Sequence, residues 1–130
     1  MSEITGKFKI DNTPVLDPQL GSKFELNPTG VWYRNMNADR CGYLVANMKK
    51  LYWIYNGISK SELNTILNII YSKLNSGSDI FTVESDVVGL GQVTDQYYIG
   101  APFNPGELIG PDLYKLEIHW IQTKGKKTIK

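Results

Sequence analysis

The sequence predicts a mainly β protein with one α-helix, folded as an antiparallel β-sandwich or partly closed barrel with the helix flanking it. Apolar and polar residues alternate in several stretches, as they do in strands with one buried face. A single stretch, near residues 59–77, has the spacing of an amphipathic helix instead. The 130 residues are 42% hydrophobic and 21% charged, which is typical of one globular domain spanning residues 1–130.

The N-terminal elements are short and lie at a sheet edge. Phe8 and Ile10 alternate with lysines and precede the turn residues 11–14, so we expect a small hairpin there. Pro14 and Pro18 confine it to an edge, because proline donates no ladder hydrogen bond. Residues 23–26 alternate again, 27–30 have the composition of a turn, and 31–33 begin another strand.

A long strand and the helix occupy the middle of the chain. From residue 43 onward the sequence is strand-like, with Leu51, Trp53 and Tyr55 on one face. Ser59 and Glu62 have the S-x-x-E spacing of a capping box, which predicts the helix start. The apolar stripe of this helix comprises Leu63, Ile66, Leu67, Ile70 and Leu74, and residues 75–77 end it.

The C-terminal half predicts three further strands. Two short ones, at residues 80–83 and 97–99, are separated by a polar connector from 84 to 96. Residues 101–111 contain three prolines and two glycines, so we expect a loop. The last strand has Tyr114, Leu116, Ile118 and Trp120 on its buried face. Residues 124–130 form a basic tail that we expect to be mobile.

The residues that carry enzyme chemistry are scarce. His119 is the only histidine and falls on the solvent face of the last strand, with no oriented partner nearby. Cys41 is the only cysteine, so there is no internal disulfide and no thiol cluster. One histidine and one cysteine cannot close a transition-metal site. We therefore expect no enzymatic activity, no cofactor and no metal.

Other candidate sites are weak. The glycines of residues 89–93 lack the third glycine of a dinucleotide loop, so this segment is interpreted as a flexible connector. Glu84, Asp86 and Asp95 are interpreted as solvated acids. Lysine plus arginine number 14 against 13 acidic residues, which gives no field for nucleic acid or membrane surfaces. No signal-like N-terminus and no membrane-length apolar run is present, so we expect neither export by a standard signal nor membrane insertion.

Aromatic residues on the strands allow two interpretations. Tyr52, Tyr97 and Tyr98 are candidates for an exposed surface that binds a glycan or another ligand. The alternative is that they pack in the core or against another subunit, as strand aromatics usually do.

The segment between residues 34 and 40 is the candidate interface. It is polar, lies between two strand-like stretches and contains Arg34, Asn35, Met36, Asn37, Asp39 and Arg40. We expect it to be the tip of a long β-hairpin, an arm whose open edges need a neighbour to cover them. Its arginines, aspartate and amides would then fix the register of that contact. A solvated loop of ordinary length is the alternative.

The order of these parts resembles small tail proteins of phages and of phage-tail-like bacteriocins of Gram-positive bacteria, relatives in fold of tail-tube and baseplate-hub proteins. The resemblance covers nearly the whole chain, with short segments of low specificity: R-N-x-N-x-D-R, L-Y-W-I-Y, S-x-x-E-L-x-x-I-L, D-I-F-T-V, Y-Y-I-G and Y-K-L-E-I-H-W. The connector at 87–92 and the loop at 102–111 depart from it, which leaves open a repeating tube subunit or a terminal piece.

The resemblance implies a β-sandwich whose copies form a ring around a central channel, with residues 34–40 as the inter-subunit arm. Its implied partners are copies of itself and other tail, sheath, hub or baseplate proteins. The implied location is the cytoplasm of a bacterial host during assembly, and then a virion tail or a released tail-like particle.

Overall fold

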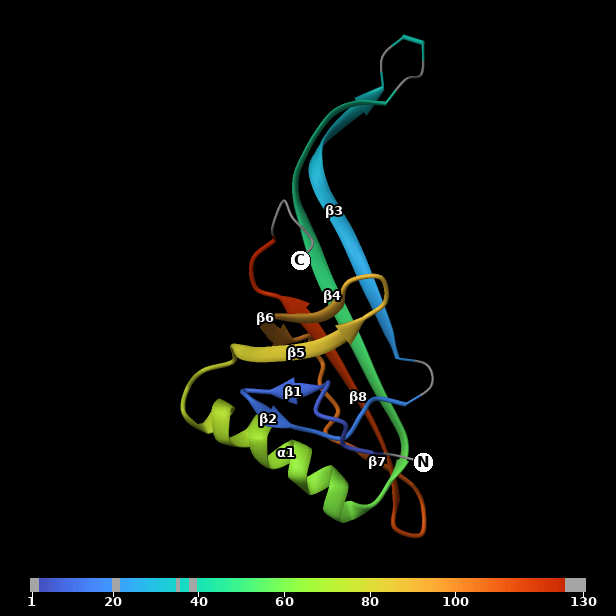
Figure 1. Cartoon of the computed structure of the whole chain (residues 1–130), viewed down its shortest axis with the longest axis vertical. Coiled ribbons are helices and arrows are strands. Elements are labelled where there is room, and N and C mark those ends of the chain that lie inside the picture. Colours follow the sequence, from blue (N-terminus) through green and yellow to red (C-terminus); the bar gives the residue numbers. More distant parts are fainter. Residues whose placement is uncertain (1–2, 20–21, 35, 38–39, 126–130) are drawn as a thin grey trace.

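The computed structural model describes residues 3–19, 22–34, 36–37 and 40–125 (Figure 1). The described elements are the strands β1 (Lys9–Ile10), β2 (Thr13–Pro14), β3 (Lys23–Arg34) and β4 (Arg40–Ile58), the helix α1 (Lys60–Asn75), and the strands β5 (Phe81–Val87), β6 (Gly91–Ile99), β7 (Glu107–Gly110) and β8 (Leu113–Gln122).

All eight strands belong to one antiparallel sheet. Their order is β2-β1-β5-β6-β8-β4-β3, with β7 paired separately to β8. The sheet folds over without closing into a barrel, so that Phe8, next to β1, meets Trp53 of β4 at a ring distance of 5.7 Å. The predicted fold class, a mainly β sandwich with one flanking helix, is confirmed.

The core fills the space between the layers. Leu51, Trp53 and Tyr55 of β4 are buried on one face, as predicted. The inner residues of β8 are buried as well, and Trp120 contacts both Trp53, at 5.7 Å, and Phe81, at 5.3 Å. These rings join strands from both layers, so the aromatic residues on this face serve mainly as core.

Helix α1 begins as the sequence predicts. The Ser59 hydroxyl accepts from the Glu62 amide at 3.2 Å, and the Glu62 carboxylate accepts from the Ser59 amide at 3.0 Å. Gly77 follows the helix with φ of +87°, a conformation that glycine adopts without steric cost. The predicted apolar face is buried at Leu63, Ile66, Leu67 and Ile70.

For one residue of that face the predicted burial is wrong. Leu74 is 44% exposed. Its position continues the stripe, but the last turn of α1 extends past the part of the core that covers the other four leucine and isoleucine side chains. Among the described residues α1 is the only helix.

The N-terminal hairpin is also confirmed. β1 and β2 pair antiparallel around Asp11 and Asn12, both with positive φ, and β2 is at the edge of the sheet. Asp11 ties the hairpin to β5, because its carboxylate accepts from the Thr82 amide at 3.0 Å. Its other carboxylate oxygen lies 3.3 Å from Lys73 of α1, so the hairpin links sheet and helix.

The turn predicted at residues 27–30 is wrong. β3 runs without a break from Lys23 to Arg34, with Pro28 opposite Asn47 of β4. The register shifts between Thr29 and Gly30, so the segment contains an irregularity rather than a reversal. Proline and glycine are tolerated there because β3 is an edge strand, where bulges and missing N–H groups disrupt no second ladder.

Two further connections are corrected. Residues 84–96 are not a connector: β5 extends to Val87 and forms a hairpin with β6, which begins at Gly91. The glycine-containing segment 89–93 is therefore the end of this hairpin and the start of β6. The loop 101–111 contains the short strand β7. Of the basic tail, residues 126–130 lie outside the described residues.

Candidate functional site

The hairpin of β3 and β4 extends far beyond the rest of the sheet (Figure 1). β8 pairs with β4 from Lys50 to Ile58, whereas β3 pairs with β4 up to the Arg34–Arg40 pair. We call the outer part, residues 26–34 with 40–49, the arm. Nine residues of extended strand span roughly 30 Å, so the arm reaches well away from the core.

The edge of β3 is open along the arm and the body. β3 is the last strand in the sheet order, and no strand lies beyond it in the part of the chain that the structure describes. A two-stranded ribbon is marginally stable by itself in water, and an exposed long edge is a template for another strand. Pro28 divides the edge, because it offers no N–H to an added strand.

The tip of the arm is exposed. Arg34 and Asn37 are exposed, and Met36 has a relative accessibility of 103%. Arg40 is the first residue of β4 and pairs with Arg34, the last residue of β3. Residues 35 and 39, Asn35 and Asp39, lie outside the described residues. The prediction of a hairpin tip is confirmed, because strands continue to both ends of this segment; its role between subunits stays a prediction.

A buried polar cluster lies where the arm joins the body. The Lys49 ammonium is 3.5 Å from the Asp95 carboxylate, and their side chains are 1% and 10% exposed. Gln122 donates to the same carboxylate at 2.6 Å and accepts from the Lys49 amide at 2.9 Å. The interpretation of Asp95 as a solvated acid is therefore wrong. The cluster connects β4, β6 and β8 at the base of the arm.

The three candidate tyrosines do not form one surface. Tyr97 is 1% exposed, so its assignment to a ligand surface is wrong. It points inward from β6 and pairs across the strands with Phe81 of β5. Burial, with a smaller effect of the Asp95 carboxylate, raises the pKa of Tyr97 above its ordinary value. Tyr98, the next residue, points outward and is 38% exposed.

Tyr52 lies on the outer face of the body, where neighbouring side chains already contact its ring. Its ring meets His119 edge-on at 4.7 Å, and the Lys23 ammonium lies 4.8 Å from the ring centre. Desolvation, followed by the Glu25 carboxylate, raises its pKa. The predicted solvent-facing position of His119 is confirmed. Tyr52 of β4 and Tyr98 of β6 pair with different residues of β8, His119 and Ile121, so one strand lies between them.

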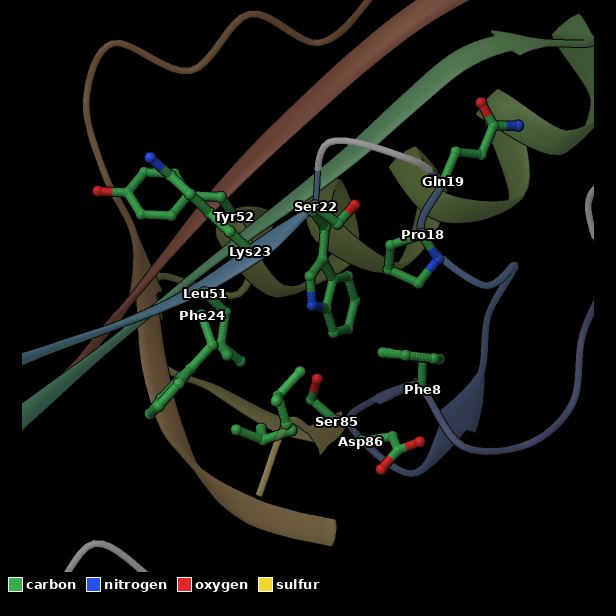
Figure 2. A pocket seen from close by; sticks show the side chains of 13 residues that line it. Phe8, Pro18, Gln19, Ser22, Lys23, Phe24, Leu51, Tyr52, Ser85 and Asp86 are labelled. Carbon is green, nitrogen blue, oxygen red and sulfur yellow. The ribbon is translucent and has the colours of Figure 1, made fainter. Parts of the chain in front are cut away.

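A cavity of about 360 Å³ opens between the two layers, beside the first residues of β3 (Figure 2). One wall comes from the start of β3 and from β4, including Phe24 and Trp53. The other comes from Phe8 and the end of β5, including Ser85 and Val87. Sequence reasoning missed this cavity, because its walls come from four separate segments.

No group of three or more histidine, cysteine, aspartate or glutamate side chains is gathered in the described ranges. Of the residues that the structure places, no helix is both long and apolar enough to span a bilayer.

Comparison with models of known protein families, with curated proteins and with solved structures gives no match in any of the three.

Proposed function

We propose that this protein is a structural subunit of a phage tail or of a phage-tail-like particle, at the tube or at the junction of tube and baseplate. It acts by joining copies of itself into rings and has no catalytic role. The observation that carries the proposal is the arm, a two-stranded ribbon that extends past the body (Figure 1). Its outer strand, β3, has 12 residues and is the open edge of the sheet.

Such an arm is unfavourable in a monomer. A soluble monomer gains no core from a ribbon that only two strands form, and an open edge promotes aggregation. In a ring, a neighbour covers that edge through main-chain hydrogen bonds, as in strand addition to exposed sheet edges. A contact between different faces of identical subunits closes into a ring when the rotation fits, and rings stack into tubes.

The body of the protein supports a rigid attachment of the arm. β4 is one continuous strand from the arm tip into the core, where Leu51, Trp53 and Tyr55 are buried. The Lys49–Asp95 pair fixes this strand against β6 and β8 at the point where the arm leaves the body. A contact made at the tip is therefore held in a defined direction.

The test is an arm-shortened variant. Residues 28–47 are replaced by Asn-Gly, a two-residue hairpin turn that closes the Asn27–Met48 pair. We expect the wild-type protein to form rings, seen by mass measurement and electron microscopy, and the variant to stay monomeric with a cooperative unfolding transition. Leu74→Asn, on the exposed end of α1, is the matched control that should still assemble.

Two outcomes contradict the proposal. One is a wild-type protein that stays monomeric at high concentration and does not assemble with tail proteins. The other is a shortened variant that assembles as the wild type does.

A free-standing module that binds a glycan is the alternative function. Its support is weak, because Tyr97 is buried and Tyr52 is already in contact with His119 and Lys23. Ligand binding that Tyr98→Ala or Tyr52→Ala abolishes, without a change in assembly, would favour it.

A further inference from the structure

We propose that the cavity beside β3 is a socket for the arm tip of a second copy, with Met36 as the side chain that fills it. The inference rests on the proposed function, in which copies associate through the arm. It adds the receiving site on the body of the neighbour.

The lining of the socket is partly apolar and partly polar. Its apolar wall includes Phe8, Phe24, Leu51, Trp53, Val87 and Val88. Val88 is 91% exposed at the turn between β5 and β6, so the apolar surface continues to the rim. A cavity of about 360 Å³ falls in the size range of sites that bury a ligand. Leu51, Trp53 and Val87 belong to the core, whereas Phe8 and Phe24 are half-buried and Val88 is open. These last three side chains keep apolar surface that burial against a partner would stabilise.

One polar group inside the socket has no counterpart. Ser85 is only 2% exposed, and its hydroxyl faces the cavity in Figure 2. Its side chain makes no hydrogen bond to any residue that the structure describes. The hydroxyl oxygen is not among the buried unpaired atoms, so it is reached from the cavity and is available to a main-chain or amide group of an entering segment.

The arm tip matches this lining. Met36 is fully exposed at the end of the hairpin, where a monomer gives its side chain nothing to pack against. Methionine is flexible and its sulfur makes favourable contacts with aromatic rings, and the socket offers the half-buried rings of Phe8 and Phe24. An exposed methionine and an unfilled aromatic cavity are therefore complementary in shape and chemistry.

Only a second copy can make this contact. The socket is lined by residues at the start of β3, such as Lys23, whereas Met36 follows the other end of the same strand. β3 has 12 residues and is extended, so its two ends are roughly 35–40 Å apart. Figure 1 shows the arm leading away from β5, whose last residues form the second wall together with Phe8.

The charges at the rim agree with this partner. Asp86 lines the socket, and its ion pair with Lys7 is long, at 4.0 Å, with both side chains well exposed. The arm tip is flanked by Arg34 and Arg40 in the sequence. Opposite charges on the two surfaces steer encounter and fix orientation. Lys23, the basic residue of the rim, already lies over the Tyr52 ring.

Cysteine cross-linking tests the socket directly. In a Cys41→Ser background, one preparation carries Met36→Cys and a second carries Val88→Cys; both native side chains are exposed, so neither change disturbs the core. The two are mixed and treated with a short bismaleimide. We expect cross-linked dimers in this mixture, and only background when Leu74→Cys, on α1, replaces Val88→Cys.

A second experiment measures assembly. Met36→Asp should abolish ring formation at concentrations at which the wild type assembles, because it places a charge in the apolar socket, whereas Leu74→Asp should not. Rings that form in the wild type without cross-linking between positions 36 and 88, or that survive Met36→Asp, overturn the socket and leave the proposed function standing. A wild type that forms no assembly under any of these conditions overturns both.

Discussion

Lys49 and Asp95 form an ion pair inside the protein, with 3.5 Å between Nζ and Oδ2 and side chains 1% and 10% exposed. They come from β4 and β6, which are not neighbours in the sheet order. Gln122 of β8, the strand between them, donates to the same carboxylate at 2.6 Å. The pair therefore holds three strands in register where the arm begins.

Removing the carboxylate should destabilise the protein strongly. Asp95→Ala leaves the Lys49 ammonium buried without a counter-charge, which costs about 3–5 kcal/mol of the free energy of unfolding. Urea denaturation measures this loss. In contrast, the double variant Lys49→Met with Asp95→Leu removes both charges and should recover most of the stability. A loss below about 1 kcal/mol for Asp95→Ala, as found for exposed pairs, would show that the pair is hydrated in solution.

The capping box of α1 predicts a smaller effect. Ser59→Ala removes the acceptor that satisfies the Glu62 amide, at 3.2 Å, and should cost about 0.5–2 kcal/mol. Ser61→Ala, two residues later in the first turn, is the control, because the Ser61 side chain does not cap the helix. Thermal unfolding followed by circular dichroism distinguishes the two. Equal melting temperatures for both variants would disprove the contribution of the cap.

Two buried tyrosines predict a loss of stability at high pH. Burial raises the pKa of Tyr55 and of Tyr97, with smaller effects from Asp17 and Asp95 respectively. In the unfolded chain both titrate near their ordinary value of about 10. The folded state holds these protons more tightly, so the stabilisation is complete below about pH 10 and is lost as the pH rises above it.

The measurement is the free energy of unfolding at pH 8 and at a pH above 10. We expect the double variant Tyr55→Phe with Tyr97→Phe to lose less stability between the two than the wild type does. Tyr55→Phe alone also removes the hydrogen bond to the Leu16 carbonyl, 2.7 Å long, at a cost of about 1 kcal/mol. Tyr98→Phe, on the exposed face, is the control. A pH dependence unchanged by the double variant would contradict the assignment.

Short sequence patterns predicted the elements that depend only on neighbouring residues. The Ser59–Glu62 box set the start of the helix, and the alternation from Tyr114 to Trp120 set the last strand. The hairpin that ends near Arg34 and Arg40 followed from two strand-like stretches on either side of a polar segment.

The strands β5 and β6 were predicted only at 80–83 and 97–99, and their missed parts contain polar residues on the inner face. Ser85 of β5 and Asp95 of β6 lie where alternation would place apolar side chains, and both are buried or nearly so. Because these two residues are polar, apolar and polar residues do not alternate regularly there, and this part of the chain has the composition of a connector. Lys49 is a similar case in β4: only the arrangement in space shows that its charge has a partner. The cavity depends on four separate segments and has no sequence signal at all.

Pairing of the open β3 edge with another copy can be measured by hydrogen–deuterium exchange in dilute monomer and in assembled particles. We predict that amides within Lys23–Arg34 exchange more slowly in the particles, whereas those of α1 (Lys60–Asn75) keep the same rates. Particles that form while β3 exchanges as fast as in the monomer would show that this edge does not pair with another copy.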